Sequence, residues 1–401
     1  RLNQGQVRYM ALFTGLPASK KHVLLFMAML NFGSTVAMQG WTMLYNNFVV
    51  NYAGLTPAQS GLVQGLRELP GLLGVTLIFF LFFIKEHRLA ALSVMAAGLG
   101  TMLTGFFPSF VPIIFTSMLM SFGFHYFEAL NNSLAIQHFD LKQTPIVMGR
   151  LRGLVAGGSL MISVFVFLFS EKLSFVWLFF VPGAVGLVLG FFGLVHPLTG
   201  SRPPKQRKRM LPQKRYWLFY VLNLLMGGRR IVFSVFAVFL MVEQFGFSVR
   251  SVSLMFMFNY AVNWMFNPMV GKIINRLGER RLMTIEYISA FVIFLGYAYT
   301  KNEYLIVLLY VFDSLTFNFS IAVRTFFQKI AFPEDAAPNM AIAQTINHIP
   351  AVTIPALGGW MWTSWGYQSV FLFGAVLTVM SLLLAQLVDR EIRMKNTQSR
   401  G

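Results

Sequence analysis

The segment Pro197–Tyr216, with the sequence PLTGSRPPKQRKRMLPQKRY, divides a chain of 401 residues into two long apolar halves. It contains seven basic residues and four prolines, and it has no apolar periodicity that would form a core. Clusters of proline and charge are typical of a solvated connection and not of a packed helix. We therefore interpret this segment as a linker held on one side of a membrane.

The composition of the two halves excludes a water-soluble globule. Hydrophobic residues make up 56% and charged residues only 11%, so polar side chains are too few to cover a soluble surface. The net charge of +18 would suggest nucleic-acid binding in a soluble protein. Here, however, the basic residues concentrate in short connections between apolar runs, which is the positive-inside pattern of membrane proteins. Because the chain has no cysteine, thiolate metal sites are excluded, and we expect no metal, cofactor or nucleic-acid partner.

Twelve apolar runs are long enough to cross a bilayer as helices, since a hydrocarbon core about 30 Å thick needs roughly 20 residues. They lie at about 23–50, 57–84, 89–107, 109–137, 144–170, 173–195, 216–242, 248–274, 282–300, 304–331, 338–364 and 368–388. Runs such as Leu173–Val195 are apolar on every face, whereas the strands of a barrel alternate. The sequence therefore predicts an all-α polytopic membrane protein with twelve transmembrane helices.

The charged loops predict the topology. Basic residues occur in the N-terminal tail, in Lys85–Arg88, in the linker, in Arg276–Arg281 and in the C-terminal tail, while the alternate loops carry little charge. Basic loops mark the cytoplasm, so both termini are expected there. The predicted parts are an N-terminal tail (1–22), a six-helix bundle (23–197), the linker (198–215), a second six-helix bundle (216–388) and a C-terminal tail (389–401).

A weak internal repeat relates the two halves. A shift of 192 residues aligns the turn at 50–56, VNYAGLT, with 242–248, VEQFGFS, and places Asn31 on Asn223. Six spans per half with such similarity are typical of a duplicated transporter. We therefore predict two pseudo-symmetric six-helix bundles.

The turn between spans eight and nine supplies a specific motif. Residues 271–281 read GKIINRLGERR and fit the pattern G-x-x-x-[D/N]-R-x-G-x-[R/K]-[R/K]. This stretch resembles the cytoplasmic motif of the major facilitator superfamily, and the segment Pro355–Gly359 is similar to a small-residue packing segment of that family. The resemblance implies the major facilitator fold, and a motif that ties helices together at the cytoplasmic face and sets the conformational balance. The matching residues are Gly271, Asn275, Arg276, Gly278, Arg280 and Arg281.

Intramembrane charges separate helices that line a pathway from helices that face lipid. A charge at mid-bilayer costs roughly 2.5–3.5 kcal/mol, so ionic residues should face a cavity or one another. Spans three, six and twelve carry no charge, and span nine has only Glu286. We therefore expect these four helices to be able to touch lipid on all sides, which matches the outer helices that the resemblance implies.

Span seven carries two adjacent arginines, Arg229 and Arg230, near its middle, and Arg230 shares a helical stripe with Asn223. A guanidinium is always charged and offers five donors, so each arginine needs an acidic partner or an anionic ligand. Two roles stay open for each: binding of an anionic solute group, or an ion pair with Asp313 or Glu128 that locks the bundle.

Span four contains the best candidate for proton coupling. His125 and Glu128 lie on one face of the predicted helix. A carboxyl group in a low dielectric can bind and release a proton near neutral pH, and a histidine one turn away can share it. Asp313 in span ten is the alternative coupling site, and Glu128 has the alternative role of neutralising an arginine.

Other intramembrane polar residues also have predicted roles. Arg67 and Glu68 are adjacent in span two, and because neighbours on a helix point about 100° apart, each is expected to have a separate partner. Ion pairing is favoured for both and for Arg324. Interhelical hydrogen bonding and solute contact are both open for four asparagines in spans one, seven, eight and eleven, Asn31, Asn223, Asn263 and Asn347. Tyr45 in span one is a candidate to line the external mouth and contact solute, with aromatic packing as the alternative.

These features predict a secondary transporter, a symporter or antiporter, that moves a small anionic or zwitterionic organic solute by alternating access, with protons as a candidate coupling ion. Efflux of lipophilic drugs is the alternative within transport, and a non-transporting receptor or scaffold is the alternative of another class. An enzyme is not expected, because the chain has no G-x-x-x-x-G-K-[S/T] segment and its six histidines lack metal-ligand spacing. We expect a monomer in a bacterial plasma membrane.

Overall fold

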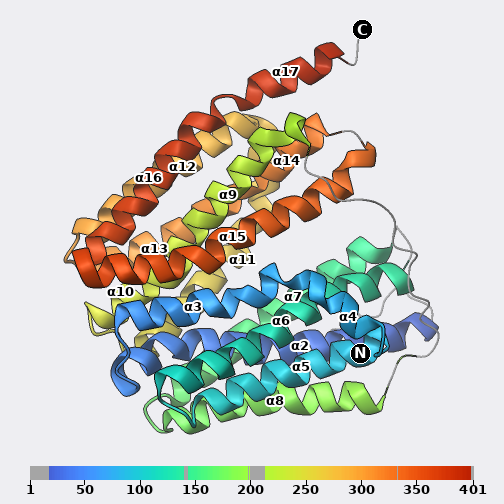
Figure 1. Ribbon diagram of the computed structural model, residues 1–401, viewed down its shortest axis with the longest axis vertical. Helices are drawn as coiled ribbons and strands as arrows, with labels where there is room; N and C mark the ends of the chain where they lie inside the picture. Colours follow the sequence, from blue (N-terminus) through green and yellow to red (C-terminus); the bar gives the residue numbers. More distant parts are fainter. Residues whose placement is uncertain (1–17, 140–142, 197, 199–212, 332, 399–401) are drawn as a thin grey trace, which may run out of the picture. The chain divides into compact units, whose positions relative to one another are not determined.

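The computed structural model describes residues 18–139, 143–196, 198, 213–331 and 333–398. All regular secondary structure in these ranges is helical (Figure 1), which confirms the all-α prediction. The predicted N-terminal tail (1–22) and the basic linker (198–215) lie largely outside the described residues.

Contacts between helices divide the chain into two compact units. Residues 1–48 and 73–206 form the first unit, and residues 49–72 and 207–401 form the second. The first contains α2 (Ala18–Asn47), the 3₁₀ turn η2 (Gly74–Thr76), α4 (Leu77–Leu81), α5 (Glu86–Thr104), α6 (Phe110–His138), α7 (Gln143–Phe169) and α8 (Phe175–Val195). A π-helical turn, η1 (Phe48–Tyr52), follows α2 at the boundary between the units.

The second unit contains more helical segments, because several spans are interrupted. They are α3 (Pro57–Leu72), η3 (Lys214–Tyr216), α9 (Trp217–Ile231), η4 (Val232–Ala237), α10 (Val238–Glu243), α11 (Val249–Leu277), α12 (Glu279–Tyr299), α13 (Glu303–Phe317), η5 (Asn318–Ser320), α14 (Ile321–Ile330), α15 (Pro333–Trp365), α16 (Tyr367–Ala385) and α17 (Val388–Gln398).

Among the described residues, eight helical segments are long and apolar enough to cross a membrane by length and composition. They coincide with predicted spans one, four to seven, nine, ten and twelve. The other four predicted spans are also helical and correspond to α3 with α4, α5, α11 and α15. Asparagines recur in α11 and also occur in α15.

The second predicted span differs from the expected continuous helix. Helix α3 ends at Leu72, the 3₁₀ turn η2 follows, and α4 begins at Leu77. Pro70, near the end of α3, has no backbone N–H to donate, and Gly74, the first residue of η2, is unfavourable within a helix. Thr76 closes the turn, since its hydroxyl donates to the Leu73 carbonyl at 2.7 Å. The two parts of this span fall in different units.

Glycines let the helices of the first unit pack backbone against backbone. A Cβ added to Gly98 of α5 would lie 2.4 Å from the backbone nitrogen of Leu187 in α8. On the other side of α5, a Cβ on Gly123 of α6 would lie 2.3 Å from the nitrogen of Ala97. Neither position has room for a side chain, which is typical of close helix pairs in membranes. Helix α5 therefore packs closely between α6 and α8 (Figure 1).

In the second unit, α9 packs against α15 and α16, and α12 packs against α16 (Figure 1). Helix α3 also packs along α15, and a Cβ on Gly61 would lie 2.1 Å from the Pro355 carbonyl oxygen. Spans seven and ten are irregular at their middles, where the π-helical η4 follows α9 and the 3₁₀ turn η5 follows α13. Such interruptions within a helix often mark functional positions.

Candidate functional site

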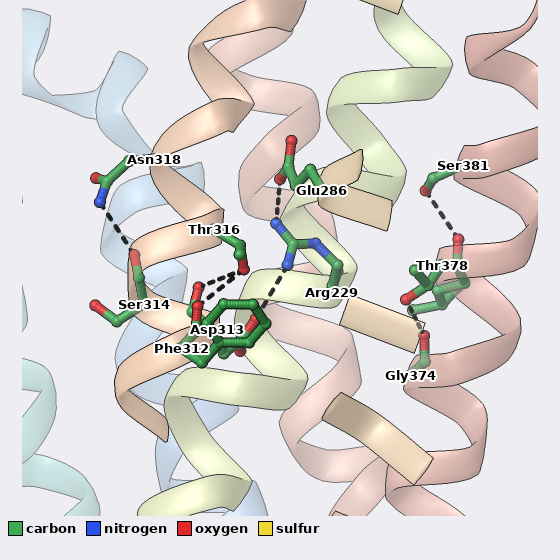
Figure 2. Close-up of polar contacts among 11 residues, drawn as sticks. Arg229, Glu286, Phe312, Asp313, Ser314, Thr316, Asn318, Gly374, Thr378 and Ser381 are labelled. Carbon is green, nitrogen blue, oxygen red and sulfur yellow. Dashed lines mark hydrogen bonds and ion pairs between the residues drawn. The ribbon is translucent and has the colours of Figure 1, made fainter. Parts of the chain in front are cut away.

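Arg229 of α9 lies in a buried ion-pair cluster within the second unit (Figure 2). Its Nη2 contacts Glu286 Oε1 of α12, and its Nη1 lies 3.3 Å from Asp313 Oδ1 of α13. The side chains of Arg229, Glu286 and Asp313 are 1%, 0% and 1% exposed. The Phe317 ring centroid lies 4.8 Å from the guanidinium carbon. The cluster therefore joins one cation to two carboxyl groups and connects three helices.

The sequence before Arg229 explains how α9 places this charge in the interior. A Cβ on Gly227 would lie 2.6 Å from the Asn347 carbonyl oxygen of α15, and a Cβ on Gly228 would lie 3.0 Å from Leu377 of α16. These two glycines bring α9 close to α15 and α16. Arg229, on a different face, then points between α12 and α13 (Figure 2).

Asn223, Gly227 and Arg230 lie on the side of α9 that faces α15. Asn347 Nδ2 donates to the Asn223 carbonyl oxygen at 3.1 Å, and Arg230 follows Gly227 by three residues, which places it on the same side. Arg230 is half-buried, whereas the adjacent Arg229 is almost completely enclosed. The two arginines of span seven therefore have different surroundings.

Asn263 connects α11 to the interrupted span ten. Its Nδ2 donates to Ser314 Oγ at 3.0 Å, and its Oδ1 accepts from Asn318 Nδ2 at 2.7 Å. Asn263 Nδ2 also bonds to the Asn259 carbonyl one turn earlier in α11. These hydrogen bonds fix the start of η5, directly after α13.

In the first unit, Asn31 of α2 and Asn131 of α6 exchange hydrogen bonds through their side-chain amides, at 2.7 and 3.3 Å. Both are buried. Tyr45 is fully buried and stacks on Trp41, with 4.4 Å between ring centroids. Asn31 therefore makes an interhelical hydrogen bond, and Tyr45 belongs to an aromatic contact within α2.

Glu128 is exposed although it lies well inside α6, and His125, one turn earlier, is half-buried. Asn132 continues the same exposed face. In a membrane a carboxylate at this depth is costly against lipid, so the face that bears it requires a polar environment.

Arg67 and Glu68 of α3 contact each other, and Arg67 Nε also donates to Gln64 Oε1 at 2.9 Å. The two charges therefore pair with each other, contrary to the expectation, because both side chains are long enough to bend toward each other along the helix; each also has a separate partner. Glu68 Oε2 also lies 3.7 Å from His348 Nδ1 of α15. Arg324 lies exposed on α14.

The turn of the predicted motif links neighbouring ends of several helices. Gly278 has a φ of 78° and separates α11 from α12, a backbone geometry that favours glycine. Glu279 accepts a hydrogen bond from Lys329 of α14 at 2.7 Å, and Arg280 Nε lies 2.9 Å from Asp389 of α17. Arg276 and Arg281 are exposed, while Gly271 and Asn275 lie in the last turns of α11.

Another polar contact lies outside the predicted spans, near the start of α15. Asp335, near the start of α15, accepts hydrogen bonds from Gln213 Nε2 at 2.7 Å and from the Tyr216 hydroxyl at 2.8 Å. These hydrogen bonds, with that from Gln213 the stronger influence, hold the pKa of Asp335 below its ordinary value. The contact fixes the entry of the chain into α9.

Comparison with known protein families identifies the family of this chain. The sequence profile of the Major Facilitator Superfamily matches residues 22–331 and 218–401. The chain belongs to the major facilitator superfamily. This membership confirms the family that the 271–281 motif predicted, and it makes the protein an integral, multi-pass membrane transporter. A search among curated proteins finds no significant match to this major facilitator protein.

Solved structures of the superfamily share the fold. A mutant form of the nucleoside transporter NupG has a TM-score of 0.74 and 18% sequence identity, covering 91% of this chain and 99% of its own. A bacterial homolog of the human lysosomal transporter Spinster, in an inward-facing and unoccupied conformation, has a TM-score of 0.74 and 13% identity, covering 95% and 99%. The predicted twelve-helix major facilitator fold is confirmed.

Glu286 is the member of the buried cluster to which sequence reasoning gave no role. The expectation that the span-nine helix, α12, can touch lipid on all sides is wrong on the face that bears Glu286, which is fully buried against Arg229. A signal was available, because a lone carboxyl in an otherwise uncharged span requires a partner. The predicted contact of Arg229 with Asp313, one of two alternatives, is present.

Proposed function

We propose that this major facilitator protein moves a small organic solute with an anionic group, an anion or a zwitterion, by alternating access between residues 23–197 and 216–388. The observation that carries the proposal is the difference between the adjacent arginines of α9. Arg229 is enclosed with two carboxyl groups, whereas Arg230 remains half-buried on the side that bears Asn223. A half-buried guanidinium in the middle of a span suits the recognition of a carboxylate or phosphate.

The surroundings of Arg230 support a binding role. Asn223 lies on the side of α9 that faces α15, the side that also bears Arg230, and Asn347 of α15 donates a hydrogen bond to the Asn223 carbonyl oxygen there. The π-helical segment η4 begins two residues after Arg230, and π-helical turns inside α-helices frequently occur at functional sites. We include Asn263, Asn31 and Tyr45 as further candidate contacts.

Proton coupling is part of the proposal. Glu128 is exposed inside α6 beside the half-buried His125, a pair that can take up and release a proton when the face becomes hydrated. Asp313 is the alternative coupling group. The cytoplasmic motif is assigned the gating role, through the contacts that Arg280 and its neighbours make with α17 and α14.

Uptake into proteoliposomes by the full chain tests the proposal. The solutes compared are carboxylates, zwitterions, nucleosides and lipophilic cations, each with and without a pH gradient; nucleosides are included because the similar NupG is a nucleoside transporter. We expect uptake of a carboxylate or zwitterion that responds to the gradient. Transport of lipophilic cations alone would support drug efflux instead, and binding without flux would support a receptor.

A pair of variants then tests Arg230. Arg230→Ala should weaken binding of the anionic solute by about 2 kcal/mol, the scale of a hydrogen bond to a charged group, or roughly 30-fold in Kd. Lys301→Ala, which removes a positive charge from the exposed connection between α12 and α13, is the matched control and should bind normally. Normal binding by Arg230→Ala would contradict the assignment.

The wider setting is also proposed and not yet tested. We propose a monomer in a bacterial plasma membrane with both termini in the cytoplasm, as the basic loops predict.

A further inference from the structure

Helices α12 and α16 pack against each other in opposite directions (Figure 1), and an exposed hydrogen bond joins them at one end. Gln386 Nε2, directly after α16, donates to Thr284 Oγ1 near the start of α12 at 3.1 Å. At the other end, the rings of Tyr297 and Phe371 pack with 5.1 Å between their centroids. The bond between Gln386 and Thr284 therefore marks one level that the two helices share.

Two arginines lie one helical turn beyond this bond, toward the ends of the helices. Arg281 precedes Thr284 by three residues in α12. Arg390 of α17 follows Gln386 by four residues, and the backbone angles of Gln386 are helical, so the helical spacing continues across the junction. Each arginine therefore lies on the side of its helix that carries the bond. Both side chains are exposed, and neither makes an ion pair or a hydrogen bond within the described part of the chain.

Exposed apolar side chains lie on the other side of the bond, toward the middle of the helices. Ile288 follows Thr284 by four residues, and Leu383 precedes Gln386 by three; both are exposed. The two stripes continue with the exposed side chains of Val292, Met380 and Val376. Seven residues separate Arg281 from Ile288, a rise of about 10 Å. This rise is enough to cross the polar region of one leaflet, roughly 5–8 Å thick, and to reach the hydrocarbon.

The charges at this level are in positive excess. Asp389 is directed to Arg280, and Glu279 to Lys329. The remaining charged side chains that the structure describes in the first turn of α12 and along α17 are Arg281, Glu391, Arg390 and Arg393. Three arginines against one carboxylate leave two positive charges beside the apolar stripes. Guanidinium groups in such a setting suit a phosphate, which they can bind through two parallel hydrogen bonds.

We propose that the exposed surface formed by α12, α16 and the start of α17 is a binding site for an anionic phospholipid. Arg281 and Arg390 bind the phosphate of the headgroup, and Ile288 and Leu383 contact the acyl chains. A free phosphate ion would use the arginines alone and leave the apolar stripes without a role. A zwitterionic phospholipid brings an ammonium group that the positive excess repels. This inference goes beyond the proposed function and does not depend on which solute is bound.

Lipid binding by the purified full chain tests this site. Phosphatidylglycerol and phosphatidylcholine with the same acyl chains are titrated separately into the protein in detergent, and the bound lipid is counted by native mass spectrometry. We expect phosphatidylglycerol to bind more tightly. The double variant Arg281→Gln/Arg390→Gln should weaken its binding by roughly 30-fold, the scale of two arginines near an anionic lipid surface, and should bind phosphatidylcholine as before. Equal binding of the two lipids, or an unchanged affinity of the double variant for phosphatidylglycerol, would overturn the proposal.

Controls separate this site from general charge attraction and from other occupants. Lys301→Gln removes an exposed positive charge beyond the other end of α12 and should leave phosphatidylglycerol binding unchanged; a loss equal to that of the double variant would overturn the site. Inorganic phosphate should not displace the lipid, and displacement would assign the arginines to a free anion instead. A dimer that persists in excess phosphatidylglycerol and dissociates in Leu383→Ser would assign the surface to a second copy of the chain and likewise overturn the proposal.

Discussion

Glu286 of α12 and Asp313 of α13 contact the same guanidinium, that of Arg229, from two different helices (Figure 2). The two carboxyls are separated by 27 residues in the chain (313 minus 286), and both are fully enclosed. Because Arg229 pairs with both carboxyl groups, it connects α9, α12 and α13 at a single point. Loss of the arginine should therefore reduce the stability of the protein more than its recognition of solute.

Arg229→Ala should lower the free energy of unfolding by about 3 kcal/mol, the scale of breaking a buried ion pair. Thermal unfolding of the purified protein in detergent measures the loss. Arg230→Ala is the matched comparison, because it removes the same side chain from the next, half-buried position, and it should lose less stability. Equal losses in the two variants would contradict the assignment of different roles.

Glycine-to-alanine substitutions should distinguish a closely packed helix position from one that contacts no neighbouring helix. Gly98→Ala places a Cβ 2.4 Å from a backbone nitrogen of α8, so it should destabilise the first unit by about 1–3 kcal/mol through overpacking. Gly157→Ala in α7 meets nothing within 4 Å, and it should stabilise the helix by up to about 1 kcal/mol. The two unfolding midpoints should shift in opposite directions; a shared direction would refute the packing described for α5.

Acidification should weaken the contact that holds the start of α9. Hydrogen bonds from Gln213 and Tyr216 lower the pKa of Asp335 from its ordinary value of 3.8. A carboxyl with a lowered folded-state pKa gives stabilisation that is present above its unfolded value and is lost as the pH falls through the folded value. Below about pH 4, hydrogen exchange at the amides of residues 213–216 should accelerate. Asp335→Asn should remove this acid response, and an unchanged response would show another group to be responsible.

The two ion pairs of the 278–281 turn should differ in strength. Arg280 and Asp389 are 42% and 45% exposed, so Arg280→Ala should cost no more than about 1 kcal/mol. Glu279 is only 7% exposed, while its partner Lys329 is 52% exposed; Lys329→Ala should therefore cost more than Arg280→Ala, about 1–1.5 kcal/mol, because solvent screens one end of the pair. Unfolding in detergent at low and high salt measures both, and salt should weaken the Arg280 pair more.

The helical membrane fold was predictable from the sequence because a helix that crosses the hydrocarbon core needs a long apolar run. The 271–281 motif indicated the family. Individual contacts were less predictable. The direction of Arg229 depends on the close approach of Gly227 and Gly228 to their neighbours, which no spacing in the sequence reveals. Arg67 and Glu68 contact each other because long side chains bend away from the directions of their Cβ atoms.

The break in span two was missed for a similar reason. Residues 57–84 are apolar enough to be interpreted as one helix, and the proline and glycines near Leu72 are each tolerated in membrane helices. The division of that span between the two units depends on the packing of α3 along α15, which involves residues about 290 positions apart.

The place of α3 has a consequence for how the chain is assembled. If the gene were split at the linker, the N-terminal fragment would carry α3 away from α15, and the C-terminal fragment would lack residues 49–72 of its compact unit. The C-terminal fragment would then be expected to require co-expression of the N-terminal fragment, whose Gly61 packs against the Pro355 backbone. During synthesis, α3 of the second transmembrane segment can likewise complete its packing only after α15, the eleventh, has been made.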